Sequence, residues 1–337
     1  MFLRCYILTQ DLKLLNSMRF IDLFAGIGGF RIALEKFSSK CVYSSEWNKY
    51  AAETYKHNFE DTPFGDITKI DEKYIPEHDI LCGGFPCQAF SISGKQGGFN
   101  DTRGTLFFEI ARILKSKKPK VVFLENVKNL AKHDNGKTLM TIKNVINDLG
   151  YSFYSKVLNS SFFGVPQHRE RLYMVCIRND LGIKNFEFPS PTFEDINLKD
   201  IVEDNLATNN YEIKRLDISL KGNPLIENNL FKTKILKPIR IGTISKGGQG
   251  ERIYSEDGHA ITLSAYGGGV ASKTGAYLIN NKIRKLSERE CLRAQGFPES
   301  FEFPKDMPRN QIYKMCGNSV SIPVIEKIFN QINFCIS

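Results

Sequence analysis

Short apolar runs alternate with helix-length amphipathic segments over the first 180 residues of the chain. Alternation of strands and helices predicts a parallel sheet with helices on both faces, so the fold class is α/β. Two later runs, joined by a loop, predict an antiparallel pair of strands at the sheet edge. The predicted strands are Arg19–Phe24, Cys41–Ser45, Asp79–Cys82, Val121–Leu124, Tyr151–Asn159 and Arg171–Arg178, and the predicted helices are Phe30–Phe37, Lys49–Asn58, Thr105–Ser116 and Thr138–Leu149.

The pattern changes after Phe186–Phe193. Asn, Asp, Lys and Gly become frequent, and no long helical pattern follows, which is typical of loops and short strands. Ser287–Arg293 and Ile322–Ile332 look helical again. We therefore predict a large domain over residues 1–199 and 288–337, and a small domain of loops and strands over residues 200–287.

Charge is unevenly distributed along this chain of 337 residues, whose net charge is +9. Residues 191–230 hold four Lys/Arg and eight Asp/Glu, a balance of −4, whereas residues 231–290 hold eleven and five, a balance of +6. The second stretch is a candidate surface for a polyanion. The eight cysteines form no C-x-x-C pair, so neither a disulfide framework nor a metal site is indicated. We expect no membrane span and no signal peptide, and hence a cytoplasmic protein.

Polar residues and glycines follow the predicted strands, where ligands of open parallel sheets bind. Phe24 opens a G-x-G-G turn that contains Gly26 and Gly28, and such a turn lets the backbone approach a ligand closely. Glu46 lies 20 residues after Gly26, where a carboxylate can accept hydrogen bonds from ribose. Trp47 could stack on an adenine or pack in the core. The turn by itself fits a purely structural role equally well, but together these residues suggest a nucleoside-bearing cofactor.

Cys87 follows a proline at the start of a loop rich in glycine and serine, GFPCQAFSISG. A lone cysteine is more often an inert core residue, but a nucleophilic thiol needs this kind of access together with a lowered pKa. Arg169 and Arg171 lie two positions apart, so both can face the same edge and provide the positive charge. Glu125 follows another strand and suits acid–base or hydrogen-bonding work, although it could simply adjoin a helix cap. The loop from Ala89 to Phe99 is either a surface loop or a lid.

Seven segments of the chain together resemble the DNA cytosine-5 methyltransferases. They occur in the family's order and span nearly the whole chain: FIDLFAGIGGF (20–30), SEW (45–47), GDI (65–67), GFPCQAFSISG (84–94), ENV (125–127), QHRER (167–171) and GNSV (317–320). The resemblance implies a Rossmann-like, S-adenosylmethionine-dependent domain and a smaller target-recognition domain. The small-domain runs KGGQGERIYS (246–255) and AITLSAYGGG (260–269) are similar to those of family members that modify the inner cytosine of GCGC.

The resemblance also implies a role for individual residues. Cys87 would add to C6 of a flipped-out cytosine, Glu125 would bind its N3 and amino edge, and the two arginines would hold the base and a flanking phosphate. Gln249 would fill the gap left by the base, and Arg252 would contact guanine. The implied cofactor site contains Phe24, Gly26, Gly28, Glu46, Trp47, Asp66, Ile67, Pro86 and Asn318. The implied DNA contacts are Ser91, Ser93, Gln249, Arg252, Tyr266 and Gly269.

Several alternatives remain open on the sequence. A tRNA cytosine-5 methyltransferase with a DNA-type fold would use the same chemistry. An NAD-dependent oxidoreductase would explain the glycine turn and Glu46 but not Cys87, Glu125 or the arginines. A methyltransferase of exocyclic amino groups would carry a D/N/S-P-P-aromatic motif, and none occurs here. A non-catalytic DNA-binding protein would not depend on its cysteine. We expect a monomer that acts on duplex DNA, without a metal, alongside a cognate restriction endonuclease.

Overall fold

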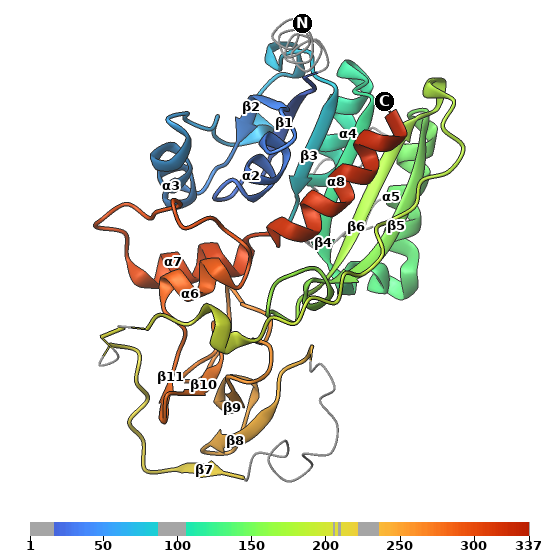
Figure 1. Ribbon diagram of the computed structural model, residues 1–337. Helices are drawn as coiled ribbons and strands as arrows, with labels where there is room; N and C mark the ends of the chain where they lie inside the picture. Colours follow the sequence, from blue (N-terminus) through green and yellow to red (C-terminus); the bar gives the residue numbers. More distant parts are fainter. Residues whose placement is uncertain (1–16, 87–105, 205, 208–209, 222–235, 337) are drawn as a thin grey trace, which may run out of the picture. The chain divides into compact units, whose positions relative to one another are not determined.

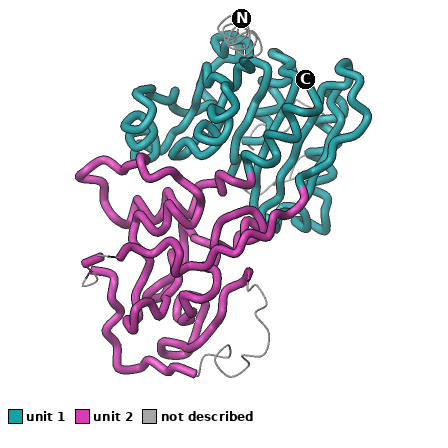
Figure 2. Tube along the Cα trace, viewed as in Figure 1, with its two compact units in different colours: residues 1–158, 171–189, 325–337 teal, residues 159–170, 190–324 magenta. Residues whose placement is uncertain are grey.

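The computed structural model describes residues 17–86, 106–204, 206–207, 210–221 and 236–336. The chain forms two compact units (Figure 2). Unit 1 comprises residues 1–158, 171–189 and 325–337, and unit 2 comprises residues 159–170 and 190–324. These limits describe packing. The division into a catalytic and a target-recognition domain is a functional one and stays a prediction.

Unit 1 is built on a six-stranded sheet with the order β2-β1-β3-β4-β6-β5 (Figure 1). The first four strands in this order are parallel, and β6 is antiparallel to β4. The predicted α/β class is therefore confirmed, and so is the position of the last two predicted strands as neighbours at the sheet edge. The strands are β1 (Arg19–Leu23), β2 (Lys40–Ser45), β3 (Ile80–Gly84), β4 (Val121–Val127), β5 (Tyr151–Asn159) and β6 (Glu170–Arg178).

Helices cover both faces of this sheet, because alternate residues of its strands point to opposite faces. On one face Val122 and Leu124 of β4 join a core with Ile110 of α4 and Ile142 of α5. On the other face Phe123 meets Phe30 of α2 edge-on, with ring centroids 5.2 Å apart. The helices are α2 (Gly29–Glu35), α3 (Lys49–Phe59), α4 (Leu106–Lys117), α5 (Lys137–Asp148) and α8 (Ile322–Ile336).

Unit 2 contains a five-stranded sheet with the order β11-β10-β9-β8-β7 and two helices (Figure 1). Its short strands agree with the predicted texture of loops and strands, and Ile241, Ile244 and Ile253 form part of its small core. The sequence did not predict α7, which is polar and contains a glycine near its end. The elements are β7 (Ile218–Leu220), β8 (Arg240–Ile244), β9 (Arg252–Ser255), β10 (Ala276–Ile279), β11 (Lys282–Arg284), α6 (Glu288–Arg293) and α7 (Arg309–Asn318).

No helix within the described part of the chain is both long enough and apolar enough to cross a membrane. Among the same residues, no group of three or more His, Cys, Asp or Glu side chains is arranged to hold a metal ion.

Candidate functional site

The glycine turn after β1 has the backbone geometry that the sequence predicts. Phe24, Gly26 and Gly28 all have positive φ, at 57°, 57° and 86°. Gly28 is required by packing as well, because a Cβ at this position would lie 2.2 Å from the ring of Phe59 on α3. The turn therefore joins β1 to α2. The N–H of Gly26 points toward the end of β2, where it donates a hydrogen bond to Glu46.

Glu46 fixes the turn to the second strand. One carboxylate oxygen accepts the N–H of Gly26 at 2.8 Å, and the other accepts the N–H of Asn48 at 2.7 Å. Glu46 is only 9% exposed to solvent. Burial raises the pKa of Glu46, whereas the backbone N–H groups of Asn48, Gly26 and Trp47 act in the opposite direction. The carboxylate thus has a fixed orientation and lone pairs left for a further donor such as a ribose hydroxyl.

Trp47 and Asp66 present exposed groups at the same strand end. Trp47 is 76% exposed, so the alternative that it packs in the core is wrong. Asp66 comes to the end of β2 because Ser45 pairs with Phe64 and its hydroxyl donates to the carbonyl of Gly65. The backbone N–H and hydroxyl of Thr68 donate to one oxygen of Asp66 and lower its pKa.

Ile67 follows Asp66 in the chain and is buried, at 2% exposure. It begins the short 3₁₀ helix η1 (Ile67–Lys69), whose N-cap is Asp66. The side chain of Ile67 belongs to the core of unit 1. The predicted contribution of Ile67 to the cofactor site stays a prediction.

The end of β3 leads to the predicted nucleophile. Phe85 is buried and Pro86 is exposed, whereas Cys87, Ser91 and Ser93 lie outside the described residues. Asn126, for which the sequence predicts no separate role, holds the backbone that follows β3. Its side-chain amide donates to the carbonyl of Phe85 at 2.8 Å, and its side-chain oxygen accepts the N–H of Val127 at 2.9 Å. The signal in the sequence was an asparagine in ENV, which follows the apolar run VVFL directly.

Glu125 and Arg171 form an ion pair at the carboxyl end of β4. Glu125 pairs in the sheet with Gly84, two residues before Pro86, and Arg171 pairs with Val127. The Nε atom of Arg171 lies 3.2 Å from a carboxylate oxygen of Glu125, and both side chains are mostly buried, at 13% and 10% exposure. An acid with a fixed orientation is thus held beside the strand that delivers the cysteine, and its charge is balanced.

Arg169 has different surroundings from Arg171. It precedes the start of β6 and belongs to unit 2. Arg169 is 2% exposed to solvent, and its guanidinium donates hydrogen bonds to the carbonyl oxygens of Leu263, Gly317 and Ser319. The predicted contact of Arg169 with the base stays a prediction, and these three partners of its guanidinium are backbone carbonyl oxygens.

The two glycine-rich segments of unit 2 contact each other through their backbones. A Cβ on Gly250 would lie 2.4 Å from the carbonyl oxygen of Gly268, and one on Gly269 would lie 3.2 Å from Gly250. Gly250 belongs to η10 (Gln249–Glu251), which is followed directly by Arg252 at the start of β9. The segments that carry the predicted DNA contacts therefore form one surface element.

The predicted DNA contacts in these segments are accessible to different degrees. Gln249 is exposed, and Tyr266 is 70% exposed with the ammonium of Lys314 5.3 Å from its ring centroid. Arg252 is half-buried, and its Nε has no hydrogen-bond partner among the described residues. Asn318, predicted for the cofactor site, is exposed at the end of α7 in unit 2.

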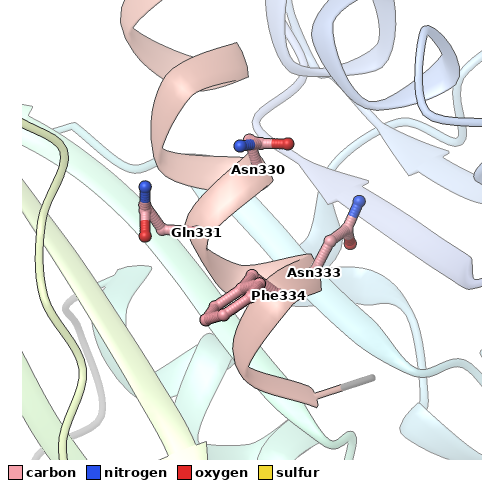
Figure 3. Close-up of a pocket in the computed structure, with 4 residues that line it drawn as sticks. All are labelled: Asn330, Gln331, Asn333 and Phe334. Atoms are coloured by element: carbon pink, nitrogen blue, oxygen red, sulfur yellow. The ribbon is translucent and has the colours of Figure 1, made fainter.

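A separate hollow lies on α8, at a different place from these strand ends (Figure 3). It has a volume of about 410 Å³, and its described lining residues are Asn330, Gln331, Asn333 and Phe334. None of these four side chains is titratable or nucleophilic. None of the predicted site residues that the structure describes lines this hollow.

A doubly wound sheet with a fixed carboxylate after β2 and an acid–arginine pair at the carboxyl end of β4 is typical of an α/β enzyme that binds a nucleoside-bearing ligand at the strand ends. Residues 18–333 match the family described as C-5 cytosine-specific DNA methylase. The chain belongs to this family and is a DNA cytosine-5 methyltransferase. Its membership decides against the oxidoreductase alternative.

Known proteins resemble the chain over almost its full length. It is 57% identical to the type II methyltransferase M.HhaI of Haemophilus parahaemolyticus, over 94% of both chains. It is 45% identical to the type II methyltransferase M.HaeII of Haemophilus aegyptius, over 93% of this chain and 92% of that one. Among solved structures, the S. pombe Dnmt2 methyltransferase is similar in fold, with a TM-score of 0.70 at 20% identity over 94% of this chain and 98% of that one.

Proposed function

We propose that the protein methylates C5 of the inner cytosine of GCGC in duplex DNA, with S-adenosylmethionine as methyl donor, as the modification enzyme of a restriction–modification system. The observation that carries the proposal is the Glu125–Arg171 pair, which lies beside the strand leading to Pro86 and Cys87. The target sequence rests on the resemblance of residues 246–255 and 260–269.

The residues after β1 and β2 fit a nucleoside with a cationic methyl donor. The Glu46 carboxylate is oriented by two backbone N–H groups and can accept from the ribose hydroxyls. The exposed indole of Trp47 offers a face for the adenine, and Asp66 has a second oxygen to accept its amino group. S-adenosylmethionine supplies an electrophilic methyl group when it is bound.

The reaction needs a nucleophile because C5 of cytosine is itself weakly nucleophilic. We propose that the Cys87 thiolate forms a bond to C6, which moves the C5–C6 π electrons toward C5 and N3. In its protonated form Glu125 donates a hydrogen bond to N3, where negative charge develops, and accepts one from the amino group, while Arg171 keeps the side chain of Glu125 in place. After methyl transfer, C5 loses its proton to a base, the double bond forms again, and the C6–sulfur bond breaks to release the thiolate.

The base must leave the stacked duplex to reach Cys87, at a cost of a few kcal/mol. We propose that Gln249 occupies the space left in the duplex, that Arg252 reads guanine through its O6 and N7 atoms, and that Tyr266 and Gly269 complete the DNA contact. Ser91 and Ser93 would contact the backbone of the DNA. The excess of positive charge over residues 231–290 supports a polyanionic partner.

We further propose that the protein works as a monomer in the bacterial cytoplasm, paired in function with an endonuclease that cuts unmodified sites. One flipped base needs one set of catalytic side chains, so the reaction itself requires no second copy. The type II methyltransferase names of the relatives support this assignment.

The test is to trap the covalent intermediate. Duplex oligonucleotides carry 5-fluorocytosine at the inner position of GCGC, and fluorine prevents the final loss of a proton from C5. The protein is incubated with S-adenosylmethionine and each duplex, and adducts are separated by denaturing electrophoresis. Cys87→Ala removes the proposed nucleophile. Cys335→Ala is the matched control, because Cys335 is a partly exposed cysteine on α8.

An adduct on GCGC that survives Cys335→Ala and disappears with Cys87→Ala would support reaction, nucleophile and target together. Adducts on a mixed-sequence library but not on GCGC would refute the target alone. Methyl transfer to tRNA without any transfer to duplex DNA would refute the proposed substrate. An adduct that persists in Cys87→Ala would refute the nucleophile.

A further inference from the structure

The QHRER motif begins as a partner of the second recognition segment, residues 260–269. Gln167 forms a parallel bridge with Ala260. The N–H of His168 donates to the carbonyl of Ala260 at 2.8 Å, and the hydroxyl of Thr262 donates back to the carbonyl of His168 at 2.6 Å. The first part of the motif and the start of the recognition segment are therefore one piece of structure.

Gln167 extends this pairing through its side chain. Its residue is fully buried, its amide nitrogen donates to the carbonyl of Ala294, and its amide oxygen accepts the N–H of Leu263. Both ends of the amide are thus used to place the backbone around the recognition segment. None of these contacts leaves the side chain open to a ligand.

Arg169 continues the same pattern with a charged group. Its guanidinium donates to the carbonyl of Leu263 in the recognition segment, and to the carbonyls of Gly317, near the end of α7, and Ser319, which follows α7 directly. The end of α7 and the recognition segment also pack directly, since a Cβ on Gly317 would lie 2.3 Å from the backbone nitrogen of Ala265. A guanidinium presents its donors in a rigid planar fork, so it can hold carbonyls from two segments in a fixed geometry, whereas the ammonium of lysine is a compact group on a flexible chain.

We infer that Arg169 is a positioning residue for sequence recognition: it holds the segment that carries Tyr266 and Gly269 against the end of α7, which carries Asn318. The inference rests on the proposed function, because it takes this segment as a DNA contact. Arg171, two residues further on, belongs to unit 1 and pairs with Glu125. The two arginines of one motif therefore have separate tasks, one in recognition and one in the chemistry of the base.

The test compares Arg169→Lys and Arg169→Met with Arg284→Lys in the full chain. Arg284 is the matched control, because it is a second buried arginine of unit 2 but bonds to Glu290 and not to the recognition segment. The first readout is hydrogen exchange at the amides of Leu263, Ser264 and Ser319. We expect exchange at least about tenfold faster, relative to the amides of β8 and β9, in both Arg169 variants and not in Arg284→Lys.

The second readout is discrimination, measured as the ratio of methyl transfer to GCGC over duplexes with one base of the site replaced. We expect this ratio to fall at least about tenfold in Arg169→Lys and to stay unchanged in Arg284→Lys and Arg171→Lys. Unchanged exchange at the three amides overturns the inference whatever the enzyme methylates. Faster exchange with an unchanged ratio overturns the recognition role.

The two failures are distinguishable. A wild-type chain that transfers no methyl group to any duplex refutes the proposed function, and the exchange readout still decides whether Arg169 holds the recognition segment. If the wild type methylates another sequence, the discrimination ratio is measured on that sequence.

Discussion

Glu46→Gln is the most direct test of the nucleoside site. Both carboxylate oxygens of Glu46 already accept backbone N–H groups, from Gly26 at 2.8 Å and from Asn48 at 2.7 Å. An amide can accept through only one of its two ends, so the variant loses one of these bonds and the negative charge beside the ribose. The bond that the charged carboxylate would make to a ribose hydroxyl is lost as well; such a bond contributes about 1.5–3 kcal/mol, which corresponds to a roughly 10- to 150-fold weaker Kd for S-adenosylmethionine.

The only tryptophan of the chain provides the assay. Trp47 follows Glu46 directly and is 76% exposed, so its fluorescence should respond when a nucleoside covers the indole. Titration with S-adenosylmethionine gives Kd for the wild type and for Glu46→Gln. Glu53→Gln is the matched control, since Glu53 lies on the exposed side of α3 and the substitution makes the same change in charge.

The pH dependence of Kd adds a second criterion. Burial raises the pKa of Glu46, so its carboxylate is lost at a higher pH than that of an ordinary glutamate. The affinity for S-adenosylmethionine should be highest above this pKa and should fall as the pH drops below it. The affinity of Glu46→Gln should not show this dependence on pH. Equal Kd values for Glu46→Gln and Glu53→Gln, with unchanged thermal unfolding, would refute the assignment of Glu46 to the ribose.

Three further outcomes are expected. Glu125→Gln removes the charge that Arg171 balances, and we expect kcat for methyl transfer in single-turnover assays to fall about 10²–10³-fold; a change below about threefold would contradict the role. Glu290→Ala leaves Arg284 buried without its carboxylate and should lower the free energy of unfolding by about 3–5 kcal/mol in urea titrations followed by circular dichroism. A decrease in unfolding free energy as small as that for a substitution at an exposed site would contradict this prediction. Burial lowers the pKa of His259 to about 4, so the unfolded state binds more protons between about pH 6.5 and 4. The unfolding free energy should be full above this window and fall by about 3 kcal/mol across it, and His259→Gln should flatten that fall.

The sheet of unit 1 was predictable from the sequence because its strands and helices have clear local patterns. The predicted strand at Cys41–Ser45, for example, begins one residue late, and the predicted helix at Lys49–Asn58 ends one residue early. Parallel order then brings the strand ends to one edge, so the position of Glu46 and Glu125 at that edge was predictable. Asn126 was harder to assign, because its role depends on the carbonyl of Phe85 on a neighbouring strand.

The recognition segments show what sequence alone leaves undetermined. Glycines at 250, 268 and 269 predict turns. They do not predict that the backbones of the two segments are in direct contact. The helix α7 was missed for a related reason. Its polar composition and Gly317 do not favour a helix locally. Gly317 is present for a tertiary reason, because a side chain at this position would collide with the backbone of Ala265.

The contrast between Arg169 and Arg171 has the same origin. A spacing of two places both residues on one face of an extended segment, and both are equally charged, so the sequence predicts a shared task. Their tasks differ because of the groups that each side chain meets: a carboxylate for Arg171 and backbone carbonyls for Arg169. A carboxylate partner keeps a base-binding acid in place, whereas carbonyl partners fix the course of the chain. Conversion of Arg171 to lysine should therefore affect the rate on every DNA sequence alike, while conversion of Arg169 should change which sequences are methylated.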